Sequence, residues 1–233
     1  MKAELVIRAL ELLQNKERAI ISQRFFKTGK GEYGEGDQFW GITVPDCRKV
    51  AKRYRDFDLS ELTDLLRHPV HECRLVALLI LVEKMKTVTG AGKDEEIVQY
   101  YLQNTRFVNN WDLVDLSADK ILGPYLLQRE KKILFQLAAS SLLWERRMAI
   151  IATFHFIKQG EFATTLEISK ALLNDHQDLI HKAVGWMLRE VGKRDQPVEE
   201  AFLRQYSTKM PRTMLRYAIE RFPEDTRQKY LKA

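Results

Sequence analysis

The chain has 233 residues, of which 45% are hydrophobic and 30% charged, and its formal net charge is +6 with an isoelectric point near 9.2. This composition excludes a disordered chain and predicts a globular one. The longest uninterrupted apolar run, LVALLILV at residues 75–82, is too short to span a bilayer. The basic balance allows nucleic acid, anionic lipid or acidic protein as a partner.

The N-terminal segment MKAELVIRAL carries an acid where a signal peptide would have its apolar core. The two cysteines, Cys47 and Cys73, are too few for a disulfide framework, and we expect both to be packing thiols. These features predict a reducing compartment, the cytoplasm.

The glycine-rich segment KTGKGEYGEGDQFWG, residues 27–41, holds five of the 11 glycines and is predicted to be a loop. It is not a phosphate-binding P-loop, because no Gly-Lys-Ser/Thr follows at the required spacing. Two interpretations stay open: a flexible connection, or a loop that contacts a backbone phosphate through Lys27 or Lys30.

Helical signals recur along the rest of the chain, where strongly helix-forming residues dominate. Asp58 and Glu61 have the spacing of a capping box, and Asp195 is a predicted N-cap with Pro197 in the first turn. No segment alternates as a strand does. The sequence therefore predicts an all-α fold of antiparallel helices with short connections.

A metal site is conceivable in HPVHEC, where His68, His71 and Cys73 lie close together. No fourth ligand is spaced to complete the set, so we predict a loop and a helix start instead. His155 is predicted to be a core histidine. Nothing in the sequence indicates a cofactor.

An internal repeat is the most informative feature. Four similar segments are ECRLVALLI (72–80), ERRMAIIAT (145–153), IHKAVGWML (180–188) and LRYAIERF (215–222). Alignment of Arg74, Arg146, His181 and Arg216 gives separations of 72, 35 and 35 residues. Because 72 is twice 36, a further copy is predicted at residue 110, within NNWDLVDL. Repeats of this length, each a helix pair, form an α-solenoid.

The register of the repeat predicts one shared surface. Trp111, Arg147 and Lys182 fall at one equivalent position, and Asp115 and Trp186 fall one turn later. Taken singly, each tryptophan is more often a core residue and each cation a solvated one. Together, two indoles, one carboxylate and two cations on one surface predict a binding site.

Three of these stretches, NNWDLVD, WERRMAI and HKAVGWMLREVGK, resemble the signature stretches of AlkD-type DNA alkylation repair glycosylases. The resemblance covers most of the chain, from FWGITVPDCRKVAK to the C-terminal helices. It implies one domain, residues 1–233, of about six HEAT-like repeats with a concave, basic groove for DNA. The chain departs from the bacterial glycosylase at Asn110, where that protein has a second tryptophan, and at the glycine-rich loop.

The resemblance also implies roles for the shared surface. Trp111 and Trp186 would bracket the sugar and backbone of the damaged nucleotide, Asp115 would be the catalytic carboxylate, and Arg147 would hold a phosphate. A single carboxylate suffices if the leaving group is an N3- or N7-alkylated purine, because that base is already cationic and needs no acid. Asp115 would stabilise the positive charge that develops on the sugar and orient a water.

We therefore expect a DNA glycosylase for cationic alkylated purines in duplex DNA, acting without a closed base-flipping pocket. Lys182 and Arg189 are expected to contact DNA as well, although Arg189 could instead pair with Glu190. We expect a monomer without metal, cofactor or membrane contact, associated with the nucleoid when bound to DNA. A non-catalytic HEAT-like protein that binds damaged or branched DNA is the main alternative, and a protein-binding solenoid is the third.

Overall fold

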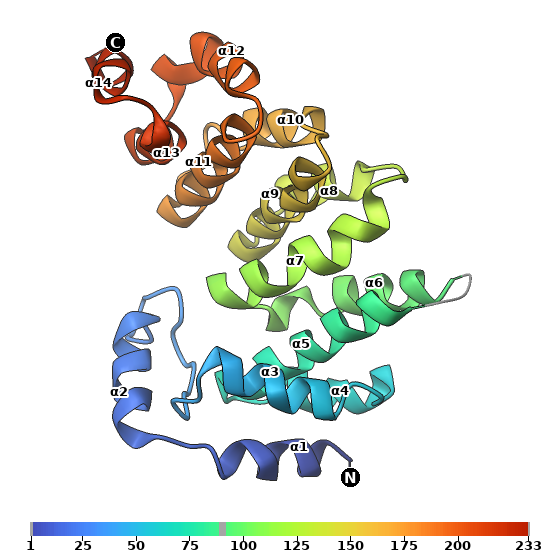
Figure 1. Ribbon diagram of the computed structural model, residues 1–233. Helices are drawn as coiled ribbons and strands as arrows, with labels where there is room; N and C mark the ends of the chain where they lie inside the picture. The colour runs from blue at the N-terminus through green and yellow to red at the C-terminus, as the bar shows by residue number, and fades with distance from the viewer. Residues whose placement is uncertain (1, 89–91, 233) are drawn as a thin grey trace. The chain divides into compact units, whose positions relative to one another are not determined.

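The protein is all-α in the computed structural model, which describes residues 2–88 and 92–232. Fourteen α-helices and three short 3-10 helices account for the regular structure of these residues (Figure 1). The one bridge of β type in this part of the chain joins Gln38 and Val70. No helix of the described residues is long and apolar enough to cross a membrane. The predicted all-α class is confirmed.

The chain divides into two compact units, Met1–Ile121 and Leu122–Ala233. The helices of the first unit are α1 (Lys2–Glu11), α2 (Lys16–Phe25), α3 (Val44–Arg53), α4 (Leu59–Leu66), α5 (His71–Thr87), α6 (Lys93–Gln103) and η1 (Thr105–Phe107). Helix α7 (Trp111–Leu126) begins in the first unit and ends in the second. The helices of the second unit are α8 (Lys132–Ala138), α9 (Leu143–Lys158), α10 (Ala163–Ala171), α11 (Asp178–Gly192), α12 (Gln196–Tyr206), η2 (Ser207–Lys209), α13 (Arg212–Ala218), η3 (Ile219–Arg221) and α14 (Glu224–Lys232).

Helix α5 is the centre of the first unit. Every residue from position 71 to position 82 is buried, including the whole LVALLILV run. A helix that is apolar on all sides must be covered on all sides. Helices α1, α3, α4 and α6 pack against it. The longest apolar run of the sequence is therefore a core helix.

Several helices begin where the sequence places a capping residue. Asp58 and Glu61 form the predicted capping box at the start of α4. The side chain of Asp195 accepts a hydrogen bond from the backbone N–H of Val198 at the start of α12. Both caps satisfy N–H groups that a helix start leaves without a partner.

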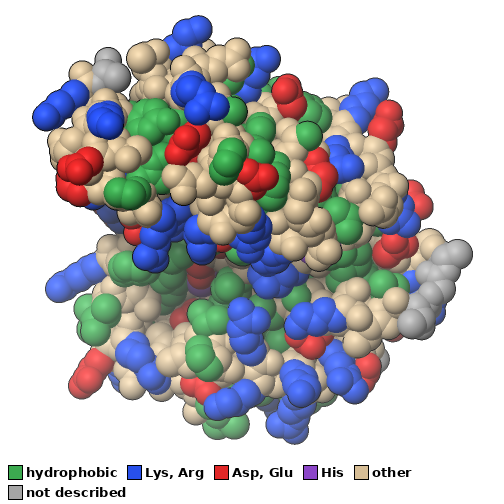
Figure 2. Space-filling view, turned by 45° about the horizontal axis from the view of Figure 1, so that its top comes forward, with side chains coloured by type: hydrophobic (Ala, Val, Ile, Leu, Met, Phe, Trp, Pro, Cys, Tyr) green, Lys and Arg blue, Asp and Glu red, His purple; other side chains and the backbone are tan. Residues whose placement is uncertain are grey.

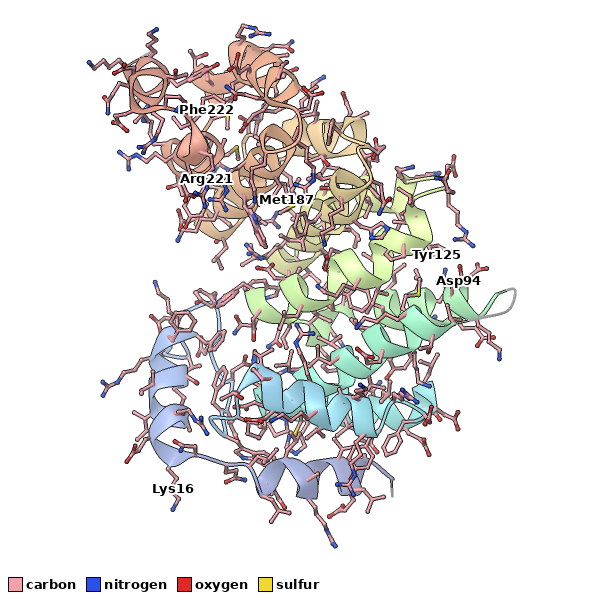
Figure 3. The ribbon with its side chains drawn as sticks, viewed as in Figure 1. Lys16, Asp94, Tyr125, Met187, Arg221 and Phe222 are labelled. Atoms are coloured by element: carbon pink, nitrogen blue, oxygen red, sulfur yellow. The ribbon has the colours of Figure 1, made fainter. Side chains whose placement is uncertain are left out.

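Helices α9, α11 and α13 form the core of the second unit, where α11 packs against both α9 and α13. Met187 of α11 is fully buried (Figure 3). Its neighbour Gly185 lies against α13, and a Cβ at this position would be 2.4 Å from the Met214 carbonyl oxygen. The glycine of GWML thus allows close helix packing beside Trp186.

Helix α7 begins about one turn later, relative to the aligned repeat positions, than α5, α9 and α11 do. Arg74, Arg146 and His181 are each the fourth residue of their helices. Asn110, by contrast, precedes the first residue of α7. Asp115, rather than Trp111, is the fifth residue of its helix, as Arg147 and Lys182 are of theirs. One turn moves a residue about 5.4 Å along the axis but returns it to nearly the same face.

A buried carboxyl in the second unit yields a stability prediction. Glu199 of α12 is 1% exposed, and its Oε1 has no hydrogen-bond partner among the described residues. Burial, assisted by the charge of Glu200, raises the pKa of Glu199 to about 8. At pH 7 this carboxyl is therefore protonated in the folded protein and ionised in the unfolded chain. Folding at pH 7 must then take up a proton, which costs free energy.

We expect Glu199→Gln to raise the free energy of unfolding by about 2 kcal/mol at pH 7. The gain should vanish as the pH falls below the ordinary value of 4.5, where the unfolded carboxyl is neutral too. Urea denaturation at pH 7 and pH 4 measures this, with the exposed Glu167→Gln as the control. An equal gain at both pH values would contradict the assignment of a neutral Glu199.

Candidate functional site

The stretch that carries the predicted site begins at the first turn of α7. Trp111 is the first residue of the helix and is half-buried. Its ring stacks on that of Phe26 at 5.2 Å between centroids, and the ring of Phe25 meets it edge-on at 5.8 Å. The end of α2 therefore supports the indole from the side, which restricts its orientation.

The aromatic contacts continue from Trp111 into the interior of the first unit. Phe26 stacks on Phe39 at 4.9 Å, and Phe39 stacks on the ring of His71 at 4.5 Å. Phe39 belongs to the glycine-rich loop and His71 is the first residue of α5. The position of the indole thus depends on a column of rings that ends at a buried histidine.

The buried histidine lies between two carboxylates. Its Nε2 is 2.8 Å from Oδ2 of Asp112, and its Nδ1 is 3.3 Å from Oδ2 of Asp37. Arg74 donates from Nη2 to Oδ1 of Asp37 at 2.6 Å. All four side chains are nearly inaccessible to solvent. Charges buried at this depth are stable only because each one has an oppositely charged partner.

Two asparagines before α7 form hydrogen bonds with the carboxylate of Asp37. Asn109 and Asn110 donate their side-chain amides to Asp37 at 3.2 and 3.4 Å. The Oδ1 of Asn110 accepts from the backbone N–H of Trp111 at 2.8 Å. We call this set of side chains the Asp37 network; its members are Asp37, His71, Arg74, Asn109, Asn110 and Asp112. The network connects the glycine-rich loop directly to the start of α7.

The charges of the network shift the pKa values of its members in opposite directions. Burial alone would raise the pKa of Asp37, but the hydrogen bond to His71 and the charge of Arg74 outweigh burial and lower it. Burial alone would lower the pKa of His71, but the charge and hydrogen bond of Asp112 raise it. The stable form is therefore an imidazolium between two carboxylates.

The glycine-rich loop is anchored along its second half. The carboxylate of Glu72 accepts hydrogen bonds from the backbone N–H groups of Trp40, Gly41 and Ile42 at 2.8 to 3.1 Å. Gly34 passes so close to α2 that a Cβ there would be 2.4 Å from the Phe26 carbonyl oxygen. These contacts argue against a loose connection. Lys27 and Lys30, which the sequence proposes as phosphate contacts, are exposed in the first part of the loop.

Three carboxylates on α7 have different surroundings. Asp112 is bound to His71, and Asp119 accepts from Lys120 at 2.6 Å and is 3% exposed. Asp115 lies one turn after Trp111 and is half-buried. Of the three, Asp115 is the one on the solvent-accessible side of the helix beside the indole.

The second unit holds the remaining predicted site residues. Arg147 is 5% exposed and donates from Nη1 to the Leu179 carbonyl oxygen. Lys182 forms an ion pair with Asp178 at 2.6 Å, and both ends remain partly exposed. Trp186 is half-buried, with its ring 5.8 Å from that of Phe154.

Arg189 does not pair with Glu190, in contrast to one of the two predictions for it. Its guanidinium contacts the carboxylate of Glu220 instead. Glu190 pairs with Lys193 at 2.8 Å and with Arg194 at 3.0 Å. These partners lie three and four residues later, in the turn that follows α11, and their spacing in the sequence could have indicated them.

The described residues contain no group of three or more His, Cys, Asp or Glu side chains that could hold a metal ion. His68 accepts from the backbone N–H of Val70 at 3.1 Å, whereas His71 belongs to the Asp37 network. Both cysteines are free and buried, and burial raises the pKa of the Cys73 thiol to about 12. The prediction of packing thiols is confirmed.

Comparison with known proteins identifies a family. Residues 6–222 match the family described as "DNA alkylation repair enzyme". Among solved structures, the chain is similar to a predicted DNA alkylation repair enzyme from Enterococcus faecalis, with 16% sequence identity and a TM-score of 0.70. The similarity covers 91% of this chain and 97% of that one, and it concerns the fold. No curated protein matches the chain significantly.

We expect Asp37→Asn to lower the free energy of unfolding by about 3 kcal/mol or more, because it leaves Arg74 and His71 buried beside a neutral group. The depressed pKa of Asp37 keeps its contribution present above the ordinary value of 3.8. The raised pKa of His71 means that its contribution is complete below 6.5 and is lost as the pH rises through the higher folded value. The difference in unfolding free energy between wild type and variant should therefore be largest between pH 3.8 and pH 6.5.

Urea denaturation from pH 5 to pH 9 measures the effect, and Asp64→Asn on the exposed side of α4 is the matched control. A difference that does not shrink as the pH rises would show that His71 is not charged in the folded protein.

Proposed function

The chain belongs to the DNA alkylation repair enzyme family, and on this premise we propose that it is a DNA glycosylase. The proposed reaction is hydrolysis of the N-glycosidic bond of N3- or N7-alkylated purines in duplex DNA. The observation that carries the proposal is the position of Asp115, a partly accessible carboxylate one turn from a supported indole.

The proposed chemistry needs one carboxylate and no acid. Alkylation at N3 or N7 makes the purine a cation, so it can leave without a proton. Positive charge then develops on the sugar, and the Asp115 carboxylate stabilises it and orients the attacking water. Asp112 and Asp119 are buried, whereas Asp115 is half-buried, and this accessibility makes Asp115 the carboxylate suited to the role.

The indoles are proposed to stabilise the same positive charge as Asp115. The face of an indole attracts cations, so Trp111 can favour the same developing charge while it excludes water. Its support by Phe25 and Phe26 fixes the ring before substrate arrives. Trp186 of the second unit is proposed as a further indole that contacts the sugar and backbone of the damaged nucleotide.

Cationic side chains of both units are proposed to contact phosphates, and Figure 2 shows many Lys and Arg side chains on the surface. Lys27, Lys30 and Lys182 are accessible enough to do so directly. Arg189 can exchange its contact with Glu220, which is half exposed, for a phosphate. Such contacts set the register of the duplex without reading its sequence.

Arg147 requires a different description. Its guanidinium is buried against the Leu179 carbonyl oxygen, in the first turn of α11. This geometry favours a positioning role, in which Arg147 fixes the helix start that carries Lys182. Direct contact with a phosphate would require the guanidinium to leave that carbonyl.

The helix pairs and the repeat spacing support the further proposal of stacked HEAT-like repeats that form one domain with a concave DNA groove. The alternative function is a protein that binds damaged or branched DNA without cleaving a bond. Asp115 argues against it, because a carboxylate repels the phosphate backbone and offers nothing to a protein that only binds.

We expect Asp115→Asn to reduce the rate of base release from duplex DNA by about 100-fold or more, because the amide cannot stabilise the cationic sugar. The measurement is single-turnover release of N7-methylguanine or N3-methyladenine, with Asp64→Asn as a control of equal charge change. Release by the variant at the wild-type rate would refute the catalytic role of Asp115. No release by either protein, with DNA binding intact, would establish the alternative function.

A further inference from the structure

A second polar site lies in the first unit, outside the surface that carries Trp111 and Asp115. It is a hollow of about 230 Å³, with Arg67, Arg74, Arg106, Phe107 and Asn109 in its wall. We call it the Phe107 pocket. One water molecule takes up roughly 30 Å³ in the liquid, so the pocket has room for a tetrahedral oxyanion with water around it.

Two arginines are held over one aromatic ring in this pocket. The guanidinium carbon of Arg106 is 4.6 Å from the centroid of Phe107, and that of Arg67 is 5.5 Å from it. Both arginines are exposed, and neither forms an ion pair with any residue of 2–88 or 92–232. The ring attracts both cations, but it does not neutralise them. An anion between them would remove their mutual repulsion.

A third arginine contributes a donor without an acceptor. Arg74 is 4% exposed; its Nη1 donates to the carbonyl oxygens of His68 and Pro69, and its Nη2 donates to Asp37. Its Nε–H has no hydrogen-bond partner in the described part of the chain. A buried donor left without a partner is costly, and an anion bound nearby would offset part of that cost.

Two carboxylates, Glu35 and Asp37, also lie in the wall and offset part of its positive charge. Asp37 is already bound to Arg74 and to the cationic His71 behind it. Glu35 accepts a hydrogen bond from the backbone N–H of Gly31 at 2.8 Å. Three guanidinium groups and two carboxylates therefore leave the wall with a net positive charge, which belongs to Arg67 and Arg106.

We propose that the Phe107 pocket binds a phosphate oxyanion between Arg67 and Arg106, and that during DNA repair this is a backbone phosphodiester near the lesion. The identification of DNA as the source rests on the proposed function; the oxyanion chemistry does not. Asn109 lines the pocket and is two residues before Trp111. A strand held here would pass close to the indole that the proposal places beside the damaged nucleotide.

The first experiment measures DNA affinity as a function of salt for wild type and for Arg67→Gln/Arg106→Gln. Each phosphate contact adds about 0.9 to the slope of log K against log salt, so the double variant should lose about one unit of slope. The control, Arg48→Gln/Arg53→Gln, removes two exposed arginines of α3, one of which lies 5.5 Å over the ring of Tyr54. We expect the slope of the control variant to fall by much less.

The second experiment titrates inorganic phosphate and follows the Arg74 Nε–H signal by NMR. We expect a saturable shift in wild type and in the control, and none in the pocket variant. If only the phosphate titration depends on Arg67 and Arg106, the pocket binds free phosphate and the DNA source is refuted. If neither experiment separates the pocket variant from the control, the proposal is overturned.

The two proposals fail in different ways. A wild-type protein that neither binds DNA nor releases base, yet shows the saturable phosphate shift, would refute the proposed function and support the pocket. Base release by the wild type, with no difference between pocket variant and control in salt dependence or phosphate titration, would support the proposed function and refute the pocket.

Discussion

The buried carboxylate of Asp37 is the group on which the geometry of the first unit depends. It lies in a glycine-rich loop, yet its partners are the first turn of α5 and the two asparagines before α7. Without it, Arg74 and His71 would be buried cations lacking one of their anionic partners, which proteins rarely tolerate. With it, the loop, the aromatic column and the indole of Trp111 have one mutually consistent arrangement. Structural stability and the preparation of the proposed binding surface thus come from the same contacts.

The same network explains how three carboxylates on one helix can differ in role. The histidine at the start of α5 engages Asp112, and a lysine engages Asp119, so their charges stabilise the fold. Asp115 lies on the accessible side, one turn after the supported indole. For a cationic leaving group, one such carboxylate is sufficient, because no second carboxyl is needed to protonate the base. The proposed activity therefore depends on the rigid placement of a few side chains.

Much of the fold follows from local sequence signals. The all-α class, the caps at Asp58 and Asp195, the core position of residues 75–82 and the packing thiols were all predictable, because each depends on neighbouring residues. The start of α7 was not, since a constant repeat length does not show where each helix begins. Asn110 and the glycine-rich loop look like two unrelated departures from the family pattern. The structure shows that they are one feature, because Asn110 donates to Asp37 of the loop. Such contacts between distant segments, like that of Arg189 with Glu220, leave no periodic signal in the sequence.

The most direct test of this account is hydrogen–deuterium exchange of wild type and Asp37→Asn under conditions where both are folded. If Asp37 fixes the loop and the start of α7, the backbone amides of Trp40, Gly41, Ile42 and Trp111 will be protected in wild type and exchange much faster in the variant. Amides of α11 in the second unit will be unchanged and serve as the internal reference. Equal protection of the loop and of Trp111 in both proteins would contradict the central role of Asp37.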